Sequence, residues 1–224
     1  QLLYAGGAVV AGALVYVFYL EQTLWTQAGN IAEDNFLLML LACIWWSISS
    51  LLVFIYPRGN RIWQHQPVVK AVFGYLTLIP AWIALLTIRQ WQYDIENNYG
   101  AWLALLVFGL VWAADIGAYF AGKRFGNHKL LPNVSPGKTI EGFAGGMLAV
   151  VVLALVVLWN FKVSSEDWLV LISAAVVIGI VSAFGDLSES MLKRDAGMKD
   201  SGNILPGHGG LLDRIDSLTA AMPV

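Results

Sequence analysis

A stretch of mixed charge between residues 182 and 216 contains the residues best suited to chemistry. It reads SAFGDLSESMLKRDAGMKDSGNILPGHGGLLDRID and follows directly on an apolar run. Ser182, Asp186 and Glu189 are spaced at i, i+4 and i+7. A helix that continued from the apolar run would therefore place all three on one face.

Basic residues and glycines follow these acids along the chain. Carboxylates, cations and glycines that allow close backbone approach are typical of a site for a metal-bound polyphosphate. Hard oxygen ligands favour magnesium over zinc, and the sequence has no Cys or His pair at zinc spacing. The alternative is a solvated charged loop between two membrane helices. The residues concerned are Lys193, Arg194, Lys199, Gly202, Gly207, Gly209, Gly210, Asp213, Arg214 and Asp216.

The same stretch resembles a known signature. The pattern Ser-x-Leu-Lys-Arg-x4-Lys-Asp-x-Gly-x2-Leu-Pro-x-His-Gly-Gly-Leu-x-Asp-Arg-Ile-Asp runs from Ser190 to Asp216, and every fixed position is filled. It is similar to the signature of the phosphatidate cytidylyltransferases, also called CDP-diacylglycerol synthases. Two earlier blocks, WxxDxxAYxxGxxFG around Asp115 and SPGKTxEG from Ser135, resemble blocks of the same family. The similarity extends over residues 112–216.

Composition indicates a polytopic membrane protein. Hydrophobic residues make up 58% of the chain and charged residues only 12%, whereas a soluble domain is about one quarter charged. Its single cysteine, Cys43, lies in an apolar run, so no disulfide framework is expected.

Six apolar runs are long enough to cross a bilayer, which takes about 20 residues. We expect an all-α membrane bundle without strands, with the chain beginning and ending within a larger helical architecture. Residues 1–111 would form N-terminal membrane helices and residues 112–224 a catalytic membrane region. The runs are 2–20, 36–56, 71–88, 101–121, 143–161 and 168–187, and a truncated seventh begins at Ser217.

The distribution of basic residues predicts the orientation. The loops over residues 57–70, 122–142 and 188–216 contain eleven lysines and arginines, and the alternate loops contain two. By the positive-inside rule, the three basic loops are cytoplasmic. The site would therefore face the cytoplasm, in a bacterial-type inner membrane.

Two more segments offer site residues. Asp115 lies within an apolar run, where an acid is costly, so it either pairs with a neighbouring helix or lines the site. Gly137, Lys138 and Thr139 resemble the end of a P-loop, but Pro132 replaces the required first glycine and no parallel sheet is expected. We therefore reject a Walker site.

The resemblance implies the reaction CTP + phosphatidate → CDP-diacylglycerol + pyrophosphate. Asp186 and Asp213 would be the principal magnesium ligands, with Asp216 and Asp115 in supporting positions. A second, monovalent cation and a homodimer stay open, and no nucleic-acid partner is expected. Substrate contacts would come from Ser135, Lys138, Thr139, Lys193, Arg194, Lys199 and Arg214, with His208 as a hydrogen-bond donor in preference to a general base.

Other membrane-protein classes fit less well. A transporter also places acids in helices, but it does not need a cytoplasmic loop this dense in Lys, Arg, Gly and Asp. The DGxxARx8Gx3Dx3D pattern of the CDP-alcohol phosphotransferases is absent from the sequence. A CTP-dependent lipid kinase is a closer alternative, because it would share both the nucleotide and the membrane.

Overall fold

The computed structural model describes residues 36–91, 96, 98–202 and 209–224. Five helices in this described part are long and apolar enough to cross a membrane. They are α3 (Phe36–Ile55), α4 (Pro67–Gln90), α5 (Tyr99–Phe125), α6 (Ile140–Asn160) and α7 (Trp168–Asp195). Helices satisfy their backbone polar groups internally, as a bilayer requires. The chain is a polytopic helical membrane protein, and the helix expected over residues 2–20 lies outside the described residues.

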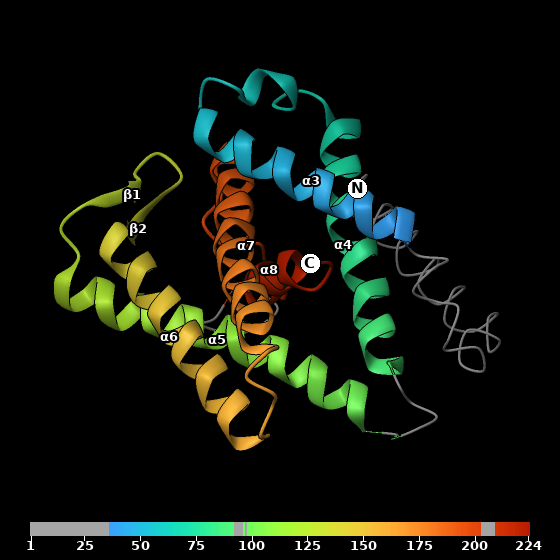
Figure 1. The fold of residues 1–224 in the computed structure, drawn as a ribbon. Helices are drawn as coiled ribbons and strands as arrows, with labels where there is room; N and C mark the ends of the chain where they lie inside the picture. Colours follow the sequence, from blue (N-terminus) through green and yellow to red (C-terminus); the bar gives the residue numbers. More distant parts are fainter. Residues whose placement is uncertain (1–35, 92–95, 97, 203–208) are drawn as a thin grey trace.

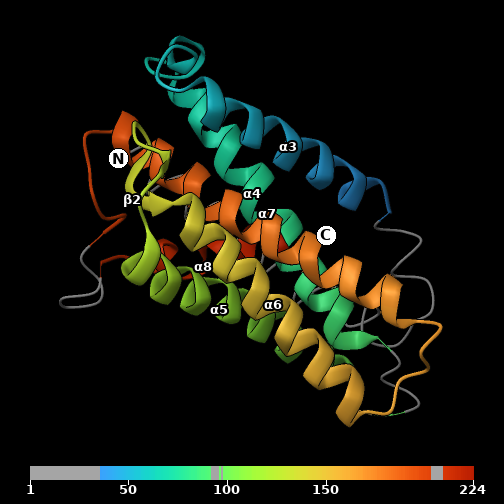
Figure 2. The same cartoon turned by 60° about the vertical axis from the view of Figure 1, so that its left-hand side comes forward.

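Helix α7 is central to the bundle (Figure 1). It contacts α3, α5, α6 and a short C-terminal helix, α8 (Leu212–Ala221). Turned by 60°, the molecule shows α7 between α3 on one side and α6 and α5 on the other (Figure 2). Gly185 of α7 faces α8, since a Cβ there would lie only 2.7 Å from the Cβ of Ala220. This glycine lets α8 pack against the segment of α7 that carries Asp186.

The loop predicted over residues 188–216 is shorter than expected, because helices occupy both of its ends. Residues 188–195 continue α7, and α8 begins at Leu212, so Asp213 and Asp216 are helical. Within the last turns of α7, Lys193 lies 3.4 Å from Glu189, an i,i+4 pair that supports helix. Basic residues in a last turn also interact favourably with the helix dipole. The polar composition ends the apolar span but does not end the helix.

A β-hairpin follows α5, so the expectation of a fold without strands is wrong. Strands β1 (Lys129–Leu131) and β2 (Ser135–Thr139) pair antiparallel, with Lys129 opposite Thr139. Val134, in the turn between them, is 1% exposed. The hairpin forms because this side chain and its apolar neighbours pack onto the helices, a tertiary contact that hydropathy alone does not reveal.

The hairpin, the C-terminal end of α7 and the α3–α4 connection lie together at one end of the bundle (Figure 2). Lys70 of α4 pairs with Asp195 of α7 at 2.9 Å, and Asn60 of the 3₁₀ helix η2 (Asn60–Ile62) donates to the same carboxylate at 3.3 Å. The described parts of the three basic segments therefore lie toward one end of the molecule. The buried core here consists of Leu52, Val53, Trp63, Val134, Leu187 and Met191.

Candidate active site

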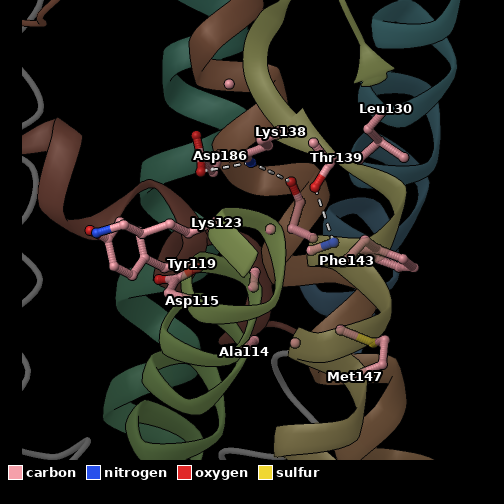
Figure 3. Close-up of a pocket in the computed structure, with 16 residues that line it drawn as sticks. Ala114, Asp115, Tyr119, Lys123, Leu130, Lys138, Thr139, Phe143, Met147 and Asp186 are labelled. Atoms are coloured by element: carbon pink, nitrogen blue, oxygen red, sulfur yellow. Dashed lines mark hydrogen bonds and ion pairs between the residues drawn. The ribbon is translucent and has the colours of Figure 1, made fainter. Parts of the chain in front are cut away.

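A pocket of about 480 Å³ lies between α5, α6, α7 and the hairpin (Figure 3). Phe143 and Met147 of α6 contribute apolar surface to it. A mostly apolar cavity with a few convergent polar groups is the usual form of a small-molecule site. Four charged side chains line the pocket here: Asp115 and Lys123 from α5, Lys138 from β2 and Asp186 from α7.

Lys138 and Asp186 form an ion pair in this pocket. Lys138 Nζ lies 2.7 Å from Asp186 Oδ2, and the two side chains are 28% and 30% exposed. The ammonium also donates to the carbonyl of Ala183 at 3.4 Å, and Ser190 Oγ donates to Asp186 Oδ1 at 3.2 Å. The pair therefore joins β2 to α7 and leaves part of each charge facing the cavity.

Thr139 holds the start of α6 against the pocket. Its side-chain oxygen accepts a hydrogen bond from the backbone N–H of Gly142 at 3.1 Å, the usual role of an N-cap threonine. The side chain is buried and still belongs to the pocket lining. Its main effect in this structure is to fix the direction of α6 directly after Lys138.

Small residues bring α5 and α6 into backbone contact beside the pocket. A Cβ on Gly117 would lie 2.7 Å from the carbonyl oxygen of Gly145, and one on Gly146 would lie 2.7 Å from that of Ala114. Larger side chains would separate the two helices. This close packing fixes the spacing of the two pocket walls, including the wall that carries Asp115.

Two further acids lie within electrostatic reach of Asp186. Asp115 is exposed, lines the pocket and experiences the charges of Asp186, Lys138 and Asp216. Asp216 lies on α8, where burial and the charge of Asp186 raise the pKa of its carboxyl. The Ser217 N–H donates to Asp216 at 2.7 Å and opposes this rise in part. Acids gathered in this way form a region that favours a cation.

Asp213 belongs to a second polar cluster outside the pocket lining. Its Oδ1 lies 2.6 Å from Lys193 Nζ, which also contacts Glu189 at 3.4 Å. Its Oδ2 accepts hydrogen bonds from Ser201 N at 2.8 Å, Ser201 Oγ at 2.9 Å and Gly210 N at 2.7 Å. Burial alone would raise the pKa of Asp213, but these hydrogen bonds hold it well below its usual range. Asp213 therefore anchors both sides of the loop between α7 and α8.

Position 209 lies against the Asp213 carboxylate, and only glycine fits its backbone conformation and the space there. Its φ is +85°, and a Cβ there would lie 2.7 Å from Asp213 Oδ2. An L side chain would be strained in this conformation and would also displace the carboxylate. The glycine thus protects the anchor that the Asp213 carboxylate makes with the loop.

The other predicted site residues lie outside the pocket lining. Arg194 is exposed and donates from Nε to the carbonyl of Val134 at 3.4 Å, which ties α7 to the hairpin turn. Lys199 and Arg214 are exposed, and Ser135 is half-buried on β2. The predicted donor, His208, lies outside the described residues. The pocket thus unites Asp115, Lys138, Thr139 and Asp186 of the predicted set.

The donor chemistry near Asp186 fits magnesium. The described residues contain no group of three Asp, Glu, His or Cys side chains close enough to hold a metal ion together. Asp186 nevertheless presents hard oxygens to the pocket with Asp115 and Asp216 nearby, as magnesium prefers. Three donors hold Asp213 Oδ2, so only Oδ1 could bind such an ion. Lys193, which now contacts Oδ1, would first have to leave it.

Sequence reasoning did not select Lys123 or Tyr119, although both line the pocket. Lys123 Nζ lies 5.7 Å from the centre of the Tyr119 ring. Together with Asp115 they are spaced at i, i+4 and i+8 on α5, and Figure 3 draws all three on the same side of that helix. This spacing is the signal that could have identified them.

Comparisons with known proteins agree on one family. A model of the cytidylyltransferase family matches residues 4–224. The phosphatidate cytidylyltransferase of Haemophilus influenzae is 41% identical over 216 residues, which cover 95% of this chain and 75% of that protein. The phosphatidate cytidylyltransferase of Pseudomonas aeruginosa is 45% identical over 220 residues, covering 98% and 74%. The Bacillus subtilis protein of the same name is 40% identical over 157 residues, covering 67% and 55%.

Proposed function

The chain belongs to the cytidylyltransferase family, and we propose that it transfers the cytidylyl group of CTP to phosphatidate. The products are CDP-diacylglycerol and pyrophosphate, and the reaction is a step of phospholipid synthesis. The observation that carries this assignment is the ion pair of Lys138 with Asp186 at 2.7 Å in a pocket between membrane helices. The same pocket is lined by the blocks around Asp115 and Lys138, both of which resemble the family.

The transfer needs little acid–base chemistry from the protein. A phosphatidate oxygen attacks the α-phosphorus of CTP, and a new phosphorus–oxygen bond forms. The bond from that phosphorus to the oxygen bridging to the β-phosphate breaks, and pyrophosphate leaves with that oxygen. A phosphate monoester is already ionised at pH 7. Catalysis therefore consists of positioning the two substrates and neutralising their charge.

Lys138 is the first of the proposed phosphate contacts. Its ammonium is partly exposed to the pocket and is held by Asp186 and by the Ala183 carbonyl. A lysine held in this way can turn from its carboxylate toward an incoming triphosphate. Further contacts are proposed for Ser135, Lys193, Arg194, Lys199, Arg214 and His208, which belong to β2 and to the segment around the α7–α8 loop.

Magnesium would be held by Asp186 and Asp213, with Asp115 and Asp216 as supporting acids. When bound, it neutralises phosphate charge and polarises a phosphoryl oxygen. If Lys193 left Asp213 Oδ1 to make room for the ion, its ammonium would be free to contact the same phosphates. The interleaving of acids and lysines supports this arrangement. A second, monovalent cation stays an open part of the proposal.

The proposed orientation places this end of the bundle in the cytoplasm, where CTP is available. The three basic segments contain eleven lysines and arginines and the alternate segments contain two. By the positive-inside rule, this difference supports the cytoplasmic orientation. We propose six membrane helices with a seventh beginning near the C-terminal end, in a bacterial inner membrane. The division into residues 1–111 and 112–224 is part of the same proposal, and a homodimer remains a prediction.

Radiolabelled CTP tests the function directly. Label in the α-phosphate should enter the lipid when the protein is given phosphatidate, and label in the γ-phosphate should appear in pyrophosphate. A CTP-dependent lipid kinase would instead move the γ-label into the lipid. Cation uptake by empty vesicles without any labelled lipid would favour a transporter.

A further inference from the structure

Lys123 is a pocket cation without an assigned role. It is exposed near the C-terminal end of α5, and it lines the same cavity as Lys138. Its ammonium lies over the ring of Tyr119 at 5.7 Å from the ring centre, a distance at which a cation–π contact forms. That contact gives a long, flexible side chain a preferred position at the pocket edge.

The two lysines of the pocket differ in whether a carboxylate neutralises them. Lys138 is neutralised by Asp186 at 2.7 Å. No ion pair joins Lys123 to a carboxylate within the part of the chain that the structure describes. Of the two pocket lysines, Lys123 is therefore the one that can accept an anion without first releasing an internal partner.

The surroundings of Lys123 indicate which anion would reach it. Ile116, Tyr119, Phe120 and Lys123 follow one another at helical spacing along α5. The first three are 56%, 60% and 65% exposed, and α5 is one of the membrane-spanning helices. Apolar side chains exposed on such a helix face lipid. Lys123 thus stands where this exposed apolar stripe meets the polar end of the pocket.

From this arrangement we propose that Lys123, positioned by the Tyr119 ring, binds the phosphate of the lipid substrate at the edge of the pocket. The inference rests on the proposed function, since it takes phosphatidate to be that lipid. The acyl chains would lie along the stripe of Ile116 and Phe120 while the phosphate turns into the cavity toward Asp186. The triphosphate would approach from the hairpin side, where Lys138 lies.

The simpler reading is that Lys123 is an interfacial anchor, as lysines and arginines near the ends of membrane helices often are. Arg124 is the matched control for this reading. It is the next residue, it is also exposed, and it stands over an aromatic ring, with its guanidinium carbon 5.6 Å from the centre of the Phe125 ring. Arg124 is not part of the pocket lining. A general anchoring effect should therefore appear equally in both residues.

Steady-state kinetics in mixed micelles of detergent and phosphatidate test the proposal. Lys123→Gln should raise the KM for phosphatidate about tenfold, the loss of one charge-assisted contact, while leaving the KM for CTP unchanged. Lys123→Arg should restore most of the affinity, and Arg124→Gln should resemble the wild type. An unchanged KM for phosphatidate in Lys123→Gln would overturn the proposal, and so would an equal rise in Arg124→Gln. A rise confined to the KM for CTP would assign the contact to the nucleotide and also overturn it.

A binding measurement separates failure of this inference from failure of the proposed function. The dissociation constant for a short-chain phosphatidate is measured in detergent without CTP, for the wild type, Lys123→Gln and Arg124→Gln. Weaker binding in Lys123→Gln alone supports the lipid-phosphate contact even if the wild type transfers no cytidylyl group. Equal binding by all three proteins overturns the contact whether or not the wild type is active.

Discussion

Lys138 Nζ lies 2.7 Å from Asp186 Oδ2, so a residue of β2 and a residue of α7 meet in one pocket. The two residues lie in separate segments of the sequence, and neither segment alone forms the cavity. The hairpin brings Lys138 to the pocket, and Gly185 lets α8 pack beside Asp186. A small extramembrane element therefore completes a site whose other walls are membrane helices.

Lys138→Ala should weaken the use of CTP. It removes the proposed triphosphate contact and leaves Asp186 without its closest cation. We expect kcat/KM for CTP to fall by the equivalent of about 1.5–3 kcal/mol. Lys129→Ala is the control, because Lys129 is exposed on the other strand of the same hairpin. An unchanged kcat/KM for CTP in Lys138→Ala would remove Lys138 from the site.

Asp186→Asn and Asp213→Asn should each abolish turnover while the protein still inserts into the membrane with normal helicity. Extra magnesium should rescue either variant little, because a lost ligand changes geometry as well as charge. Asp167→Asn is the control, since Asp167 is exposed at the start of α7 and caps the helix with no side-chain hydrogen bond. Near-normal turnover of both variants at ordinary magnesium would refute the proposed metal site.

Gly209→Ala should impair activity more than Gly197→Ala. Both glycines have positive φ, +85° and +68°, so alanine should be strained at both positions. A Cβ at Gly209 would also press on Asp213 Oδ2 at 2.7 Å, whereas one at Gly197 meets nothing within 4 Å. The comparison of kcat for the two variants isolates the Asp213 anchor. Equal losses of activity would show that backbone strain alone matters.

Asp195→Ala should lower the midpoint of heat denaturation in detergent. The Asp195 side chain is fully buried and holds Lys70 at 2.9 Å and Asn60 at 3.3 Å. Lys70 is 32% exposed, so solvent screens part of the loss, and we expect a cost of about 1–3 kcal/mol. A Lys70→Ala, Asp195→Ala double-mutant cycle measures the coupling. Additive effects of the two substitutions would mean that the ion pair contributes nothing.

Cysteine labelling should establish the orientation. In a Cys43→Ser background, Lys199→Cys lies at the basic end of the bundle and Lys162→Cys lies in the turn between α6 and α7. An impermeant maleimide should label Lys162→Cys in intact cells and Lys199→Cys only in inverted vesicles. Labelling of Lys199→Cys from outside intact cells would reverse the topology.

The sequence predicted the described membrane helices well, because long apolar runs leave few alternatives to a spanning helix. We did not predict from the sequence that α7 extends to Asp195 or that a hairpin follows α5, and the two omissions share a cause. Besides the local Glu189–Lys193 pair, residues 188–195 are held by long-range contacts such as that of Asp195 with Lys70, as Val134 is by its core neighbours, and local composition does not encode these contacts. Hydropathy therefore located the spans and misjudged the polar segments that follow them.

The same distinction applies to the site. Motif reasoning placed Asp115, Lys138 and Asp186 in one site, and the structure brings them to one pocket. It also grouped Asp213 with Asp186, whereas the structure engages both oxygens of Asp213 with Lys193 and the α7–α8 loop. Lys123 went unnoticed because it was counted as a loop charge, although α5 continues to Phe125.

The proposed function is tested most directly by transfer of α-phosphate label from CTP to phosphatidate by the purified protein, measured for the wild type and Asp186→Asn. Under the proposed function we expect labelled CDP-diacylglycerol with the wild type, none with Asp186→Asn, and no labelled lipid when the label is in the γ-phosphate. Labelled lipid from γ-labelled CTP, or undiminished α-label transfer by Asp186→Asn, would contradict it.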